Sequence, residues 1–219
     1  MNQLSYTKYL QEIIADTAAG YPIFVSGLGK KLAAKYNLDE KNANAAAAVA
    51  VKRIFDAKAN PTLRYFGKGI YFLAKPTVFG ETGIDKEKLI ELKYLSGDNG
   101  YETGLTMMHK LGLTTLMPAE RVFVSNKALG RTKRDEALNI TVKAPKIPVN
   151  KENKPYLQIL DLLNIYGDVP VDADNPYHIF SRLIEANRLD YRRLLFMADQ
   201  HYGNDTILRL AHVASRQGA

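Results

Sequence analysis

The sequence predicts an α+β fold in two domains, residues 1–78 and 84–219. Two helical patterns follow each other closely between residues 26 and 57, and a strand–turn–strand pattern with two glycines continues to residue 74. Beyond residue 120, two β-rich runs precede a series of helical patterns. We therefore expect helices and a short hairpin in the first domain, and an α/β arrangement with a helical C-terminal part in the second.

The composition is that of an ordinary folded protein. The chain has 219 residues, of which 46% are hydrophobic, and it contains no cysteine, which excludes a disulfide framework and a thiolate metal site. No apolar run approaches the roughly 20 residues that a membrane span needs. The N-terminus lacks the basic start and the continuous apolar core of a signal peptide. We expect a cytoplasmic protein.

The net charge of +7 is concentrated in the first domain. Residues 1–78 carry nine lysines and two arginines against five carboxylates, a net charge of +6, whereas residues 79–219 carry +1. Basic residues release condensed counterions when they neutralise phosphates, so this excess is typical of nucleic-acid binding. A solubilising surface charge is the alternative interpretation.

The first helix is expected over residues 4–18, and Gly20 ends it. Its apolar side chains recur every three to four residues, at Tyr6, Tyr9, Leu10, Ile13 and Ile14. A short extended segment at 21–25 is expected to pair with the later hairpin. Ser26 suits the N-cap of the second helix, whose apolar side carries Leu28, Leu32 and Tyr36.

The third helix is expected from about residue 41 to residue 57, with an inward stripe of Ala47, Ala50 or Val51, Ile54 and Phe55. Small residues on its other side would permit close approach to the floor of a DNA groove. Asn42 or Asn44 could accept and donate together at the edge of an adenine. We expect phosphate contacts from Lys41, Lys52, Arg53 and Lys58. Alternatively, the alanines only raise helix propensity and the asparagines face water.

A β-hairpin is expected over residues 62–74, with its turn at 66–69. Gly67 and Gly69 permit the positive φ angles of a tight turn, and Arg64 and Lys68 flank that turn. Two helices followed by a hairpin with a cationic tip are the order of a winged helix-turn-helix. In that fold the second of the two helices enters the major groove of DNA and the wing lies beside it. Residues 79–83 are expected to form a linker.

The second domain is expected to begin with a helix from Asp85 to Leu95, a turn at 97–100 and a helix over 103–111. Met107, Met108 and Leu111 share one face of that last helix, which favours core packing over an exposed partner surface. Runs at 121–125 and 138–142 indicate strands. Further helices are expected over 156–166, 177–186, 190–201 and 204–215.

The charged segment between the two expected strands is interpreted as a hairpin tip or loop. Arg131, Lys133 and Arg134 could extend a phosphate-binding surface into the second domain. Asp135 and Glu136 follow at once, so a solvated loop of mixed charge fits the segment equally well.

The sequence contains no motif for catalysis. It has no P-loop, no nucleophile elbow, and no pair of histidines with metal-ligand spacing beside a glutamate. Asp98, Glu102 and Lys110 could suggest a nuclease, but turn and helix-surface positions explain them as well. We expect no enzyme activity, no metal and no cofactor.

Residues 100–128, GYETGLTMMHKLGLTTLMPAERVFVSNKA, resemble the AbiE-type antitoxins of abortive-infection, type IV toxin–antitoxin systems, when taken with the upstream helices and the FGKGIYFL hairpin. The resemblance covers about residues 5–145. It depends on the order of the parts more than on any single residue.

The resemblance implies a protein that binds repeats in its own promoter, represses its operon and counteracts a co-encoded nucleotidyltransferase-like toxin, typically without a stable complex. It places DNA contacts on the third helix around 41–53 and on the hairpin around 64–68. We expect a monomer in solution or a dimer on double-stranded DNA. A plain transcription regulator whose second domain senses a ligand or partner is the alternative. The candidate DNA-binding residues are Lys30, Lys31, Lys41, Asn42, Asn44, Lys52, Arg53, Arg64, Lys68, Arg131, Lys133 and Arg134.

Overall fold

The computed structural model describes residues 3–128 and 130–215, with side chains described from Tyr6 onward. It is a mixed α+β structure with 51% of its residues in helices and 15% in strands, as the sequence predicts at this level. The chain divides into two compact units, Met1–Leu89 and Ile90–Ala219. No described helix is both long enough and apolar enough to cross a membrane.

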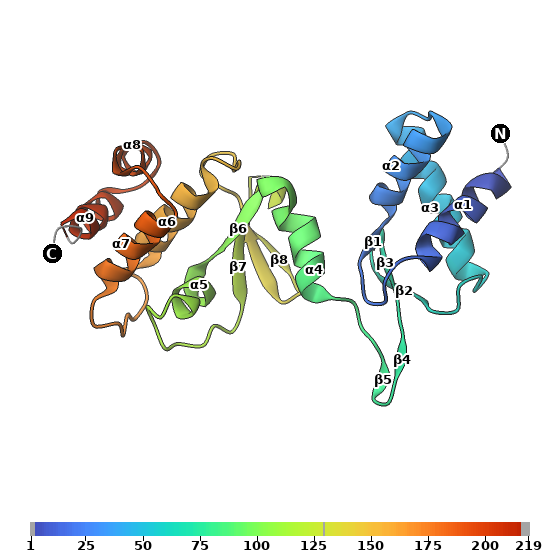
Figure 1. Ribbon diagram of the computed structural model, residues 1–219, viewed down its shortest axis with the longest axis horizontal. Coiled ribbons are helices and arrows are strands. Elements are labelled where there is room, and N and C mark those ends of the chain that lie inside the picture. Colours follow the sequence, from blue (N-terminus) through green and yellow to red (C-terminus); the bar gives the residue numbers. More distant parts are fainter. Residues whose placement is uncertain (1–2, 129, 216–219) are drawn as a thin grey trace. The chain divides into compact units, whose positions relative to one another are not determined.

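The first unit packs helices against a small antiparallel sheet (Figure 1). The sheet has the strand order β1-β3-β2, so the short strand before the second helix pairs with the far strand of the hairpin, as expected. In chain order the elements are α1 (Gln3–Ala15), β1 (Ile23–Phe24), α2 (Val25–Tyr36), α3 (Glu40–Asp56), β2 (Leu63–Gly67) and β3 (Ile70–Leu73).

The core of this unit lies where α1, α2 and α3 meet the sheet. Each fully buried leucine or isoleucine there contributes about 1.5–3 kcal/mol through removal of its surface from water. The buried side chains are Leu10, Ile14, Ile23, Leu28, Leu32, Ala43, Ala47, Ala50, Val51, Ile54, Leu63 and Leu73. Phe55, expected among them, is 36% exposed at the edge of α3, where its ring contacts Tyr71.

The start of α2 differs from the expectation. The helix begins at Val25, Phe24 occupies the N-cap position, and Ser26 lies within the first turn. The main-chain N–H of Val25 donates to the carbonyl of Gly69 at 2.9 Å. This contact with the hairpin turn, which is distant in sequence, satisfies a donor at the helix start and fixes where α2 begins.

The hairpin turns at Lys68 and Gly69, between β2 and β3. Gly69 has a φ of 71°, which is the conformation that favours glycine. Gly67 was expected to share that role, but it ends β2 beside an irregularity in register. The pairing of Tyr65 with Tyr71 brings their rings to a centroid distance of 5.3 Å.

The expected linker forms a second, smaller hairpin. Strands β4 (Pro76–Thr77) and β5 (Gly80–Glu81) pair antiparallel, with Val78 and Phe79 at the tip. The main-chain N–H of Asp85 then donates to the carbonyl of Gly20 at 2.8 Å. Because these contacts hold residues 75–85 on the first unit, the division between the units falls inside helix α4 (Lys86–Ile90).

The second unit contains a four-stranded mixed sheet with the order β6-β7-β9-β8. Its strands are β6 (Gly100–Thr103), β7 (Arg121–Ser125), β8 (Lys133–Asp135) and β9 (Ile140–Lys143). β7 and β9 run parallel, and the outer pairs are antiparallel. β6 lies between the expected turn at 97–100 and the expected helix at 103–111, in a segment where the sequence predicts no strand. The charged segment that the sequence predicts as a hairpin tip or loop contains the edge strand β8.

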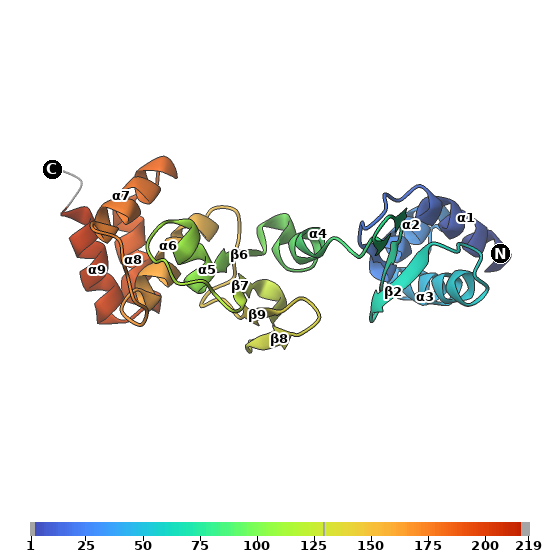
Figure 2. The same ribbon diagram turned by 90° about the horizontal axis from the view of Figure 1, so that it is seen from below.

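Helices cover this sheet and form the C-terminal end of the second unit (Figure 2). The expected helix over 85–95 is divided into α4 and a π-helical turn at Glu91–Leu95, followed by a 3₁₀ turn at Ser96–Asp98. A second 3₁₀ turn, at Asn126–Ala128, follows β7. The remaining helices are α5 (Gly104–Lys110), α6 (Lys154–Ile165), α7 (Pro176–Ala186), α8 (Tyr191–His201) and α9 (Asn204–Ala214).

The second core lies among α5, α6, the sheet and the last three helices. The expectation of core packing for α5 is confirmed, because Met108 is fully buried and Met107 and Leu111 pack against the same cluster. The periodic helix α6 supplies its centre with Leu157, Leu160 and Leu163, all at 0% exposure. The helices beyond residue 154 thus share one core with the sheet.

Candidate nucleic-acid interface

Helix α3 buries one side in the core of the first unit and presents the other to solvent. Asp39 caps its start by accepting a hydrogen bond from the main-chain N–H of Asn42 at 2.9 Å. Buried and exposed residues alternate with helical period, so the exposed side is a continuous stripe. This stripe consists of Lys41, Asn42, Ala45, Ala48, Val49, Lys52, Arg53 and Asp56.

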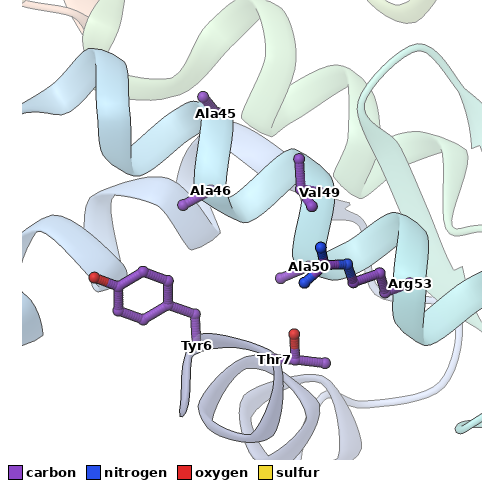
Figure 3. Close-up of a pocket in the computed structure, with 7 residues that line it drawn as sticks. All are labelled: Tyr6, Thr7, Ala45, Ala46, Val49, Ala50 and Arg53. Atoms are coloured by element: carbon purple, nitrogen blue, oxygen red, sulfur yellow. The ribbon is translucent and has the colours of Figure 1, made fainter. Parts of the chain in front are cut away.

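A shallow hollow of about 270 Å³ runs along this stripe between α1 and α3 (Figure 3). Tyr6 and Thr7 of α1 form one wall. The other wall is formed on α3 by Ala45, Ala46, Val49, Ala50 and Arg53. Val49 is 47% exposed, a large fraction for a valine in the middle of a helix. Helical spacing in the sequence predicts Val49 on the side of α3 opposite the core, and its exposure confirms this position. The sequence does not predict the wall that α1 forms.

The two asparagines of α3 differ in their surroundings. Asn42 is exposed, and its side-chain amide donates to the carboxylate of Asp39, so part of its hydrogen-bonding capacity is used at the helix cap. Asn44 lies against Gly29 of α2, and its buried Oδ1 has no hydrogen-bond partner among the described residues. A base contact from Asn44 would require its side chain to leave this helix–helix contact.

The lysines expected near DNA are exposed in this unit. Lys30 and Lys31 lie on α2, Lys41 and Lys52 lie on α3, and Lys68 forms the hairpin turn. Lys58, which follows α3, is also exposed and has a positive φ of 49°. These side chains can neutralise phosphates without the cost of desolvating a buried charge.

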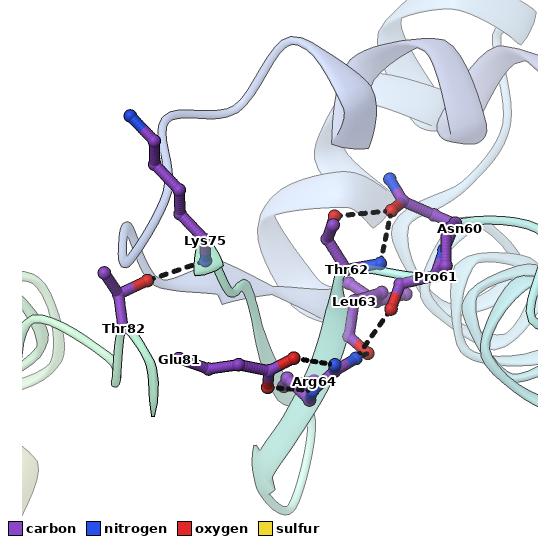
Figure 4. Close-up of polar contacts among 8 residues, drawn as sticks. All are labelled: Asn60, Pro61, Thr62, Leu63, Arg64, Lys75, Glu81 and Thr82. Carbon is purple, nitrogen blue, oxygen red and sulfur yellow. Dashed lines mark hydrogen bonds and ion pairs between the residues drawn. The ribbon is translucent and has the colours of Figure 1, made fainter. Parts of the chain in front are cut away.

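Arg64 has a structural role that the sequence did not predict (Figure 4). Its Nε lies 2.9 Å from Oε2 of Glu81, and its Nη2 donates to Oε1 of the same carboxylate. Its Nη1 donates to the carbonyl of Pro61 at 2.8 Å. The hydrogen bonds from Arg64 hold the pKa of Glu81 below its usual value. The expected phosphate contact from Arg64 therefore competes with the ion pair that joins β2 to β5.

The smaller hairpin presents two apolar side chains at its tip. Val78 is 95% exposed and Phe79 is fully exposed. The hydroxyl of Thr77 donates to the carbonyl of Gly80 at 2.7 Å, and the hydroxyl of Thr82 accepts from the main-chain N–H of Lys75 at 2.8 Å. The two threonine hydrogen bonds close the small hairpin, and the Arg64–Glu81 pair joins it to β2.

The three basic candidates of the second domain are all exposed in the second unit. Arg131 precedes β8, and Lys133 and Arg134 lie on that edge strand. The guanidinium of Arg134 lies 3.5 Å from a carboxylate oxygen of Glu120. The carboxylate of Asp135 points to a different set of partners, Lys93 and Tyr94, at 2.7 and 2.8 Å.

The carboxylates considered for a nuclease are paired with cations. Asp98 lies 3.2 Å from Lys154, and Glu102 accepts from Lys110 and from Arg121. Within residues 3–128 and 130–215, no three histidine, aspartate or glutamate side chains gather into a group that could hold a metal ion. The Asp98 pair joins the 3₁₀ turn before β6 to the start of α6, and the Glu102 pairs join β6 to α5 and β7.

A cavity of about 170 Å³ in the second unit is lined in part by the carboxylate of Asp161. Asp161 accepts hydrogen bonds from the hydroxyls of Tyr101 and Tyr202, each at 2.7 Å. Burial raises the pKa of Asp161, which outweighs the opposing effect of the two tyrosines and of Lys146. Lys143, Lys146 and Asn164 also line this cavity, together with apolar side chains of β7 and α6, so its wall combines charged, polar and apolar groups.

Comparison of the chain with protein-family models, with curated proteins and with solved structures finds no match.

Proposed function

We propose that the first unit is a winged helix-turn-helix that binds double-stranded DNA. The observation that carries this proposal is the exposed stripe of α3, an N-capped helix packed on α2 and followed by the β2–β3 hairpin. In this proposal α3 enters the major groove and the hairpin lies beside it as the wing. Lys68 at the hairpin turn then contacts the phosphate backbone.

The charge of this part of the chain supports the same proposal. Residues 1–78 carry a net charge of +6, and Lys30, Lys31, Lys41 and Lys52 are exposed on α2 and α3. Positive charge beside a helix that can enter a groove provides the sequence-independent part of DNA affinity. The apolar centre of the stripe leaves room for close approach to base edges.

We further propose that the protein represses its own operon and acts as an antitoxin against a co-encoded nucleotidyltransferase-like toxin. The support for this part is the resemblance of residues 100–128 and of the hairpin to AbiE-type antitoxins. Repression requires binding at promoter repeats in the cytoplasm, as a monomer or as a dimer formed on the DNA. The second unit would then carry the neutralising function, without catalysis.

A reporter gene placed behind the DNA upstream of the protein's own gene tests repression. Expression of the wild-type protein should lower reporter output, and Lys52→Ala together with Lys68→Ala should restore it. Co-expression with the product of the adjacent gene tests the antitoxin function through rescue of growth. Repression without rescue would support a regulator that is not an antitoxin.

A second candidate function is a transcription regulator that senses a ligand through its second unit. The cavity around Asp161 favours this candidate, because Lys143, Lys146 and Asn164 offer polar groups at its wall. In this case a small polar molecule would change DNA affinity, and the adjacent gene would have no effect on growth. Measurement of repression with and without that gene separates the two candidates.

A further inference from the structure

The exposed side of α3 is apolar where a DNA-reading helix would face the bases. Ala45, Ala48 and Val49 occupy the middle of the stripe, and their alkyl side chains neither donate nor accept hydrogen bonds. Val49 also has a lower helix propensity than alanine, and it leaves apolar surface in water. Helix propensity therefore does not favour a valine at this position, and about half of its surface remains in water.

The apolar middle of the stripe borders a hollow between α1 and α3. Ala45 and Val49 are one helical turn apart, so their side chains are neighbours on the helix surface. Both line the hollow of about 270 Å³, and Tyr6 supplies the wall that faces them from α1 (Figure 3). A group of methyl size can enter such a surface and contact several carbon atoms at once.

Cations lie on both sides of the apolar centre. Lys41 precedes Ala45 by one turn, and Lys52 follows Val49 by three residues, so both share its exposed side. Asp56 lies at the C-terminal end of the stripe, where its carboxylate disfavours a nearby phosphate. The charge pattern therefore favours an arrangement in which the N-terminal and central parts of α3 lie in a DNA groove. The phosphates that border the groove would then lie near Lys41 and Lys52.

We propose that Ala45 and Val49 recognise thymine methyl groups in the major groove. The C5-methyl of thymine is the apolar group that a base presents there, and it is the feature that alkyl side chains can distinguish. The preferred DNA then carries thymines where it faces the middle of α3. This inference rests on the proposed DNA-binding function and specifies which feature of the bases that function reads.

The test compares two DNAs of the same sequence. The segment upstream of the gene is amplified with thymidine triphosphate or with deoxyuridine triphosphate, so that the second product lacks only the methyl groups. The wild-type protein should bind the uracil DNA about fourfold more weakly or worse, the factor that corresponds to loss of one buried methyl-sized group. Val49→Ala should bind the two DNAs with a much smaller difference.

Val78→Ala is the matched control, because it also shortens an exposed valine of the first unit, and it should keep the wild-type ratio. Circular dichroism checks that each variant is folded. Equal affinity of the wild-type protein for thymine and uracil DNA would overturn the inference and leave DNA binding intact. The same conclusion would follow if Val49→Ala kept the wild-type ratio of thymine-DNA to uracil-DNA affinity. Failure of the wild-type protein to prefer the upstream thymine DNA over a scrambled thymine DNA would instead remove the proposed function, and this inference with it.

Discussion

Arg64 and Glu81, 17 residues apart in the chain, form a two-point ion pair between strands β2 and β5. The pair links the main hairpin of the first unit to the smaller hairpin that follows it. It also neutralises a cation that would otherwise lie on the proposed wing. The effect of Arg64 on DNA therefore depends on whether Glu81 retains its charge.

Glu81→Gln should make DNA binding more dependent on salt. The substitution removes the carboxylate that neutralises Arg64, so one more cation can release counterions from DNA. A plot of the logarithm of the binding constant against the logarithm of the salt concentration should steepen by roughly 1. Glu152→Gln, which removes an exposed carboxylate of the second unit, is the control. An unchanged slope for Glu81→Gln would show that Arg64 does not approach phosphate even when its partner is neutral.

Lys52→Ala and Lys68→Ala should each weaken binding to all DNA sequences. Each removes an exposed cation from the proposed interface, one on α3 and one at the hairpin turn. Each should reduce the salt slope by roughly 1 while leaving the ratio of upstream to scrambled affinity nearly unchanged. Lys151→Ala, at an exposed position before α6, should have no effect. Wild-type slopes for both lysine variants would mean that the DNA surface lies elsewhere.

Gly29→Ala should destabilise the first unit by about 1–3 kcal/mol, as overpacking of a close contact does. A methyl group at this position would overlap Oδ1 of Asn44 and lie 3.0 Å from its Cα, at the contact between α2 and α3. Gly27→Ala is the matched control on the same helix, because the nearest atom to its added methyl would be Cβ of Phe24 at 3.9 Å. That variant should be neutral or slightly more stable. Urea unfolding of both variants measures the difference, and equal stabilities would contradict the tight helix contact.

The stability of the second unit should fall at acidic pH because of Asp135. Burial raises the pKa of this carboxyl, but hydrogen bonds from Lys93 and Tyr94 outweigh burial and hold the pKa below its usual value. A lowered pKa in the folded state adds stability above the unfolded-state pKa, about 3.9, and this stability is lost as pH falls through the folded-state pKa.

Asp135→Asn tests this dependence. The free energy of unfolding should drop by about 1–3 kcal/mol at pH 7, because hydrogen bonds to a charged acceptor are lost. The difference from wild type should shrink as the pH falls below about 4. Asp174→Asn, at an exposed position before α7, is the control. A difference that is independent of pH would show that the charge of Asp135 contributes nothing to stability.

The long periodic elements of the fold could be predicted from the sequence. Helices α3 and α6 have stripes of buried residues at helical spacing, and their expected ranges agree with the structure within a few residues. The same holds for β7, whose apolar run is buried in the sheet. In these segments the local pattern and the tertiary packing favour the same structure.

Three short elements outside the predicted β2–β3 hairpin could not be predicted, because they depend on partners that lie elsewhere in the chain. Strand β8 has a charged sequence and forms by pairing with β9, and β6 forms by pairing with β7. The β4–β5 hairpin has strands of two residues and depends on Glu81 meeting Arg64. Local propensity gives little signal for strands of this length.

The same distinction applies to the candidate interface. The exposed lysines of α2 and α3 follow from helical spacing, so their surface positions could be predicted. The burial of Oδ1 of Asn44 could not, because it depends on close packing against Gly29. The pairing of Arg64 could not be predicted either, because its partner Glu81 lies in a segment whose sequence predicts a linker.

A binding titration tests whether the first unit recognises a specific DNA sequence. The protein is titrated with DNA from immediately upstream of its own gene and with a scrambled DNA of the same composition, at two salt concentrations. We predict clearly tighter binding to the upstream DNA than to the scrambled DNA at each salt concentration. The affinity for either DNA should fall as the salt concentration rises. Equal, weak and salt-sensitive binding to the two DNAs would contradict sequence-specific recognition and leave only a basic surface.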